Sequence, residues 1–166
     1  MTLAETLLPE FDREMAVTRK LLERVPDGQF EWRPHAKSMT LGRLAGHLAE
    51  LAQWVSVTIT QSSLDVAIPR PEGFTAPGTR AAVLALFDTQ VAAARAALIG
   101  RSDAELQAPW SLKRGDEIVF TMPKAGVLRM MVFNHIVHHR GQLSVYLRMH
   151  DVPLPSIYGP SADEAM

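Results

Sequence analysis

Four stretches of the chain carry apolar side chains at every third or fourth position, and this spacing restricts the possible folds more than any other feature. An α-helix places such residues on one face, so each stretch predicts an amphipathic helix with one side to bury. The expected helices cover about residues 3–25, 40–61, 79–98 and 123–150. Because four such helices bury one another most simply as a bundle, residues 1–166 are expected to form one all-α domain, a four-helix bundle.

Residues near the expected helix ends are consistent with these boundaries. Thr2 and Glu5 can form a capping box, whereas Pro9 suits a first turn, so the start of the first helix is open between these positions. Ser38 is a candidate N-cap for the second helix, and Gly100 can end the third.

The segments between the helices also carry signals. Residues 109–122 alternate apolar and polar side chains on both sides of a Gly115–Asp116 turn, which predicts a small β-hairpin packed against the bundle before the last helix. The alternating residues are Trp110, Leu112, Ile118 and Phe120. The connection 62–78 contains three prolines and two glycines, and its length for a connector hints at function.

Composition excludes several classes of function. With Lys+Arg 17 and Asp+Glu 18, the net charge of -1 offers no basic field for nucleic acid or an anionic membrane surface. The absence of cysteine excludes disulfides, thiolate metal sites and cysteine nucleophiles. The N-terminus is acidic where a signal peptide is basic, and no run of 18 uninterrupted apolar residues follows, so the expected location is the cytoplasm.

The segment 133–142, FNHIVHHRGQ, holds three histidines within five positions. His135 and His139 are four residues apart on the expected helix, so both imidazoles can reach one point. They lie on its apolar stripe, and burying a polar group without a partner costs about 1–3 kcal/mol. A divalent metal ion would satisfy both rings.

His47 is the remaining inward-facing histidine on a helix. It shares a side of the second helix with Leu44, Leu51, Trp54 and Thr58, opposite Ala45, Ala49, Gln53 and Ser56. The economical assembly is therefore a site of three imidazoles from His47, His135 and His139. Three nitrogen ligands leave a coordination position open, as in catalytic zinc sites, where water reaches a pKa of about 7.

The other histidines have simpler interpretations. His138 is expected to pack beside the ligands, because neighbouring helix positions point about 100° apart. His35 and His150 are expected to be solvated. A single inward histidine is more often a hydrogen-bonded core residue than a ligand, and position 136 is Ile rather than the Glu of an H-E-x-x-H peptidase motif.

Catalytic groups are harder to assign. The candidate general base is Glu50, one turn after His47, although a solvated position suits it equally, and Asp12 or Glu14 are the other candidates. Gln142 and Tyr146 can line the pocket or accept an imidazole proton, and both would also suit a plain core position.

A second apolar surface of the last helix consists of Met130, Phe133 and Val137. It lies roughly opposite His135, so either another part of this chain covers it or a second copy does. A homodimer is the favoured expectation.

Three segments together carry a family resemblance, and they are FEWRPHAKSMT, LGRLAGHLAEL and the long stretch from residue 133 to 164. They closely resemble the DinB-like, or DinB/YfiT-like, family of metalloenzymes. The resemblance implies a bundle of variant up-and-down topology and a divalent metal, zinc or nickel, on His47, His135 and His139. It also implies frequent dimers, and some relatives are S-transferases or isomerases that use a low-molecular-weight thiol such as bacillithiol or mycothiol.

The leading hypothesis is a metal-dependent hydrolase or thiol S-transferase acting on a small-molecule substrate. In this hypothesis the connection 62–78 and the C-terminal segment 155–161 cover the pocket. The alternatives are a non-catalytic metal-binding stress-response module and a helical interaction domain without metal.

Overall fold

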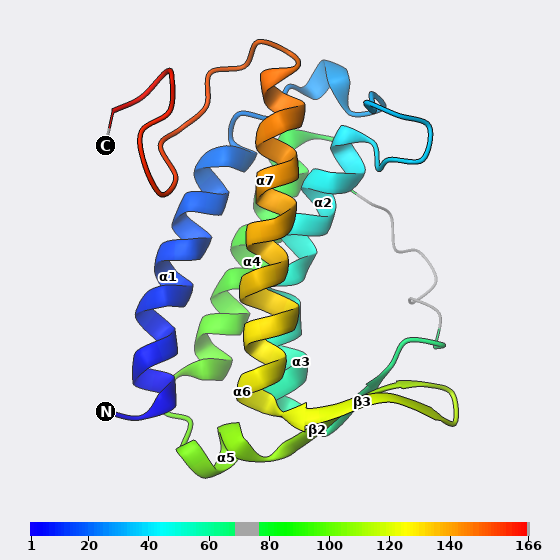
Figure 1. Cartoon of the computed structure of the whole chain (residues 1–166), viewed down its shortest axis with the longest axis vertical. Helices are drawn as coiled ribbons and strands as arrows, with labels where there is room; N and C mark the ends of the chain where they lie inside the picture. Colours follow the sequence, from blue (N-terminus) through cyan, green and yellow to red (C-terminus); the bar gives the residue numbers. More distant parts are fainter. Residues whose placement is uncertain (69–76, 166) are drawn as a thin grey trace.

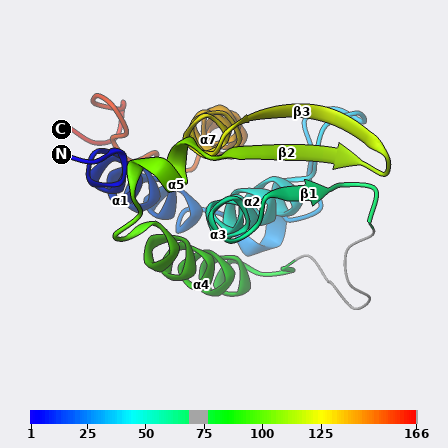
Figure 2. The ribbon, with the colours of Figure 1, turned by 90° about the horizontal axis from the view of Figure 1, so that it is seen from below.

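The computed structural model describes residues 1–68 and 77–165. Long helices run side by side along the molecule (Figure 1), and they are α1 (Leu3–Leu22), α2 (Leu41–Leu51) with α3 (Gln53–Thr60), α4 (Arg80–Leu98) and α7 (His135–Arg148). Seen from the end, α1, α4, the α2–α3 pair and α7 surround one core (Figure 2). Ala52 keeps helical dihedrals of φ −61° and ψ −27° between α2 and α3, so the two helices form one rod. The predicted four-helix bundle is confirmed.

Capping residues decide where the first two rods begin. The Thr2 hydroxyl accepts the Glu5 N–H at 3.2 Å and the Glu5 carboxylate accepts the Thr2 N–H at 2.7 Å, so α1 begins at Leu3 and Pro9 lies inside it. The prediction that Ser38 caps the second helix is wrong. Thr40 caps α2, because its hydroxyl accepts the Arg43 N–H at 3.1 Å directly before the first helical residue.

The last predicted helix is divided in the structure. A short α6 (Lys124–Val127) leads into the π-helical segment η2 (Leu128–Asn134), and α7 follows without a break. A π-helical turn holds more residues than an α-helical turn, so directions counted at about 100° per residue do not hold across η2. His135 and His139 both lie after it, so their shared direction is kept.

A three-stranded sheet lies beside the bundle (Figure 2), at its lower end in the view of Figure 1. The predicted hairpin is formed by β2 (Pro109–Arg114) and β3 (Glu117–Pro123), which are antiparallel. Its Trp110 is fully buried, with its ring 6.2 Å from that of Trp54, so the hairpin is anchored to α3. The sequence did not predict β1 (Ser63–Asp65), which pairs parallel with β2.

Two short helical segments complete the described structure. The 3-10 helix η1 (Asp27–Gln29) follows α1, and α5 (Asp103–Gln107) follows α4. A capping box of Ser102 and Glu105 starts α5, and these hydrogen bonds lower the pKa of the Glu105 carboxyl to about 2.

The second apolar surface of the last helix is partly covered by the chain itself. Phe133 is only 3% exposed and packs edge-on against Phe11 of α1, with ring centroids 6.4 Å apart. Met130 and Val137 are 38% and 37% exposed. The homodimer stays a prediction.

Helix α4 is long and apolar enough to cross a membrane by length and composition alone, with 22% of its most apolar window buried. It packs against α1, α2 and α3 within the bundle. A single helix of this kind is weak evidence for a membrane span, because core helices of soluble proteins meet the same criteria.

The close approach of α2 to the preceding loop depends on Gly42. A Cβ at this position would lie 2.4 Å from Cδ1 and 3.1 Å from Cβ of the buried Phe30. We expect Gly42→Ala to lower the free energy of unfolding by about 1–3 kcal/mol, because overpacking outweighs the better helix propensity of alanine. Urea denaturation measures this change.

The matched control is Gly141→Ala in α7. A Cβ at this position meets no atom within 4 Å, so the free energy of unfolding is expected to rise by up to about 1 kcal/mol. Equal stabilities of the two variants would contradict the role of Gly42.

Candidate metal centre

Three imidazoles from two helices converge between α2 and α7. The Nε2 atoms of His135 and His139 are 2.9 Å apart, and Nε2 of His47 is 3.4 Å from that of His135. One ligand atom from each of the three rings lies within 4.8 Å of the others. His139 is buried at 8% exposure, and the other two rings are half-buried. The group can hold a metal ion.

The surroundings of these rings orient their nitrogens. Nδ1 of His139 donates to the Gln142 side-chain oxygen at 2.7 Å, and the ring of His135 hydrogen-bonds to the Met131 backbone, one turn earlier. Each ring makes this bond on one side. The lone pair of its Nε2 therefore faces the opposite side, toward the other ring. Two lone pairs at this separation repel unless a cation or a proton lies between them, so the arrangement suits a shared cation or a shared proton.

Burial keeps the rings in the form that coordinates metal. Loss of hydration lowers the pKa of His135 and of His139 below the ordinary value of 6.5, and this effect exceeds the opposing hydrogen bonds. Nearby His138 lowers both pKa values further. Neutral imidazole is the metal-binding form, so the pocket favours it at neutral pH.

Two of the three nitrogen–nitrogen separations agree with ordinary coordination. Zinc–nitrogen bonds of about 2.0–2.1 Å at tetrahedral angles place two nitrogens roughly 3.3 Å apart. The pair His47 and His135 meets this at 3.4 Å, and the 2.9 Å between His135 and His139 corresponds to an angle of about 90°. These two separations suit one shared metal ion, and the ligand atoms of all three rings lie within 4.8 Å of one another.

Sequence and structure comparisons place the chain in a family. The sequence model of the DinB family matches residues 1–165. The chain belongs to the DinB family. It is 31% identical over 160 residues to "Uncharacterized protein YrdA" of Bacillus subtilis (strain 168), covering 95% of this chain and 89% of that protein.

Two solved structures share the fold of this DinB-family protein. The DinB-like protein YjoA of Bacillus subtilis superposes with a TM-score of 0.71 at 19% identity, over 90% of this chain and 96% of that one. A DinB-like protein of Bacillus cereus ATCC 10987 gives a TM-score of 0.73 at 23% identity, over 95% and 98% of the two chains. At these identities the likeness concerns the fold alone.

Glu50 lies at the edge of this centre. It is only 8% exposed, so the alternative of a solvated Glu50 is wrong. Its carboxylate is 3.6 Å from the Arg43 guanidinium, and it lines the same cavity as His47. A role as general base stays a prediction.

The two acids of α1 are engaged elsewhere. Asp12 forms an exposed ion pair with Arg95 at 2.9 Å. Glu14 is buried and binds Arg140 at 2.7 Å. Neither contact involves the three histidines, so neither acid is supported as a base.

Tyr146 lies seven residues after His139, about 10 Å further along α7. Its hydroxyl donates to the Met39 carbonyl at 3.3 Å, and its ring packs edge-on against Trp32 at 5.5 Å. These contacts join α7 to the loop before α2, and a role of Tyr146 in the pocket stays a prediction.

The remaining histidines differ in their surroundings. His138 is exposed and packs edge-on against His139, with ring centroids 4.8 Å apart. His35 is exposed in its loop, as predicted. The prediction of a solvated His150 is wrong, because its half-buried ring packs 4.3 Å from that of Trp32.

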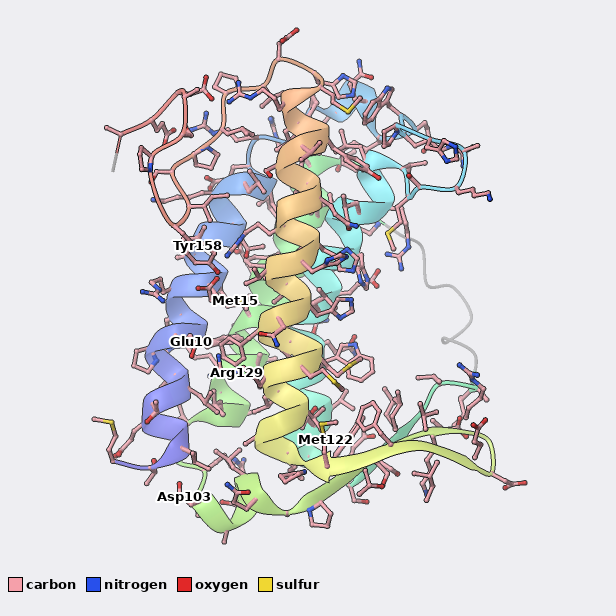
Figure 3. All side chains as sticks on the ribbon, in the orientation of Figure 1. Glu10, Met15, Asp103, Met122, Arg129 and Tyr158 are labelled. Carbon is pink, nitrogen blue, oxygen red and sulfur yellow. The ribbon has the colours of Figure 1, made fainter. Side chains whose placement is uncertain are left out.

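The C-terminal segment 155–161 lies away from the cavity that contains His47. Its Tyr158 lies between α1 and α7 (Figure 3), where the hydroxyl bonds to Glu14 at 2.8 Å and accepts from Arg140 at 2.5 Å. No residue of 155–161 is among the described residues that line the cavity, so the expectation that this segment covers the pocket is wrong. Residues 69–76 of the connection lie outside the described structure.

The sequence interpretation did not single out Arg140, directly after His139. It is 1% exposed, and its partners Glu14 and Tyr158 are 126 and 18 residues away in the chain. An arginine on the apolar side of a helix was the available signal, since such a charge requires a buried partner.

Proposed function

We propose that this DinB-family protein is a cytoplasmic metal-dependent enzyme, with a divalent ion on His47, His135 and His139. The observation that supports this is the convergence of three imidazole nitrogens, two of them 2.9 Å apart. Zinc and nickel are the expected ions, because imidazole suits both. The reaction class is hydrolysis of, or thiol transfer to, a small molecule.

The chain's own residues have distinct parts in this proposal. Gln142 holds His139 in the tautomer that presents Nε2. Arg43 holds the Glu50 carboxylate beside the cavity, where it can accept a proton from the nucleophile. When bound, a divalent ion supplies Lewis-acid character that lowers the pKa of water or a thiol toward neutrality.

Metal content and affinity test the ligand set. We expect one ion per chain, and we expect His47→Ala to weaken binding by more than the roughly 10- to 100-fold that loss of an outer-shell partner costs. The matched control is His138→Ala, because His138 is exposed and outside the converging group. Elemental analysis measures the metal content, and competition with a chromophoric chelator measures the affinity for the metal. Equal affinity of His47→Ala and the unaltered protein would show that the ligand set is wrong.

Activity separates the enzyme from a non-catalytic metal module. Metal-loaded protein is screened with bacillithiol, mycothiol and small electrophiles by thermal shift, and hits are assayed for turnover. Glu50→Gln is expected to abolish turnover while metal content is kept, because it removes the proton acceptor alone. Stoichiometric metal with no turnover, and a lower melting temperature on chelation, would favour the non-catalytic module.

A further inference from the structure

The outer side of the rod formed by η2 and α7 is exposed and carries no formal charge. Apart from histidine, Arg140 is the one charged residue between Arg129 and Arg148, and it is only 1% exposed. The exposed apolar side chains of this rod are Met130, Val137, Val145 and Met149. The rod lies at the front of the molecule in Figure 1 and at the outer edge of the end-on view in Figure 2, where no other described helix covers it. An exposed apolar surface of this kind is typical of an interaction site.

Gly141 lies at the centre of this surface. Glycine inside a helix is less favourable than alanine, so its presence needs a reason. The described chain supplies none, because a Cβ here would meet no atom within 4 Å and the residue is not among the glycines with positive φ. What glycine offers instead is room for a second backbone to come close to α7.

The surface is complementary to itself. Side chains four residues apart form a ridge along a helix, and Val137, Gly141 and Val145 form such a ridge on α7. The two valines lie at equal distances on either side of the glycine. When two copies of α7 cross antiparallel at Gly141, Val137 of each copy therefore meets Val145 of the other. Self-complementarity of this kind is what a two-fold interface requires.

This crossing brings no like charges together. It places Arg148 of one copy opposite the uncharged Asn134 of the other. The Arg148 guanidinium already pairs with Asp163 of its own chain, and Arg129, at the other end of the surface, pairs with Glu10 at 2.5 Å. The contact therefore buries no unpaired charge, which is the main cost of a polar interface.

We propose that a second copy of this chain packs on this surface, with the two α7 helices crossing antiparallel about a two-fold axis at Gly141. The sequence favoured a dimer through Met130, Phe133 and Val137, but Phe133 packs against Phe11 of its own chain, so the contact moves toward the C-terminal end of α7. Gly141 points about 160° away from His139 around the helix. The interface therefore leaves the metal centre open and does not depend on a bound metal.

Sedimentation velocity of the full-length protein measures the dimer. One pair of helices forms a small interface, so we expect a dissociation constant of roughly 1–100 μM. Gly141→Lys is expected to weaken the dimer at least about tenfold, because two lysines would face each other at the axis. Lysine is also the better helix former, so a thermal melt should show that the variant still folds. A protein that stays monomeric up to about 1 mM would overturn the proposal.

A pair of charges tests the register of the two helices. Val137→Glu and Val145→Lys are each expected to weaken the dimer at least about tenfold, because each buries a charge against a valine of the other copy. The double variant places these opposite charges against each other, so it should dimerise at least about fivefold more tightly than either single variant. Within one chain the two positions are two helical turns apart, too far for a direct pair.

The matched control is Ala92→Glu on the exposed side of α4, which adds the same charge to another uncharged helix surface. It is expected to change the dissociation constant less than about twofold. Two outcomes would overturn the assignment of the interface to α7. One is a dimer that Ala92→Glu weakens as much as Val137→Glu does. The other is a double variant that dimerises no more tightly than the single variants.

Discussion

Lowering the pH from 7 to 5 is expected to release the metal ion from His47, His135 and His139. Only a neutral imidazole can coordinate the metal. Once all three rings are protonated, the affinity for the metal falls by up to about a thousandfold per pH unit. Because burial lowers the pKa of His135 and of His139, affinity should stay level down to about pH 6.5 and fall steeply only below it. Chelator competition at pH 8, 7, 6 and 5 measures the profile. Binding unchanged at pH 4.5 would contradict a site of three histidines.

The metal-free protein should show a related dependence of stability on pH. The folded state has the lower pKa for His135 and His139, so as pH falls the unfolded chain takes up protons first. The stability associated with these neutral rings is complete above about pH 6.5 and is lost as pH falls toward and through the folded pKa values. His138→Ala, which removes the exposed neighbouring ring, should keep the downward trend.

The bundle was predictable because its signals are local. Helical spacing of apolar residues and the capping box at Thr2 act within a few positions, so they can be recognised in a sequence alone. The segment β1 is three residues long, too short for a periodic pattern, and its pairing with β2 depends on residues far along the chain. The π-helical segment η2 also has an apolar pattern that an α-helix would share.

Contacts between helices explain what the sequence interpretation of the site missed. Ala45 and Ala49 lie on the side of α2 away from His47, yet both are fully buried, because α2 packs against α4 as well as against α7. The convergence on His47 was predictable since helical spacing placed each ring on an inner face. The surroundings of Glu50 and His150 were not, because packing between distant segments determines them.

Arg140→Met is expected to lower the free energy of unfolding by about 3–5 kcal/mol, the cost of leaving a buried charge without its partner. The guanidinium is 1% exposed and binds the Glu14 carboxylate at 2.7 Å, with further bonds to the Glu14 carbonyl, the Thr18 hydroxyl and the Tyr158 hydroxyl. Glu14 is 4% exposed. Without Arg140, its carboxylate keeps only the hydrogen bond from the Tyr158 hydroxyl and a weak contact with Arg13 at 3.9 Å. Urea denaturation at pH 7 measures the change as a lower midpoint at an unchanged slope.

Two further variants identify burial as the cause. Arg129→Met removes a similar arginine–glutamate pair with Glu10, 2.5 Å apart between the same two helical rods but exposed (Figure 3), and is expected to cost at most about 1 kcal/mol. The double variant Glu14→Gln with Arg140→Met removes the uncompensated carboxylate, so it should recover much of the stability lost in Arg140→Met. Two outcomes would show that this buried pair does not join α1 to α7 as the structure indicates. One is a loss of stability in Arg140→Met that is no larger than the loss in Arg129→Met. The other is a double variant that is less stable than Arg140→Met.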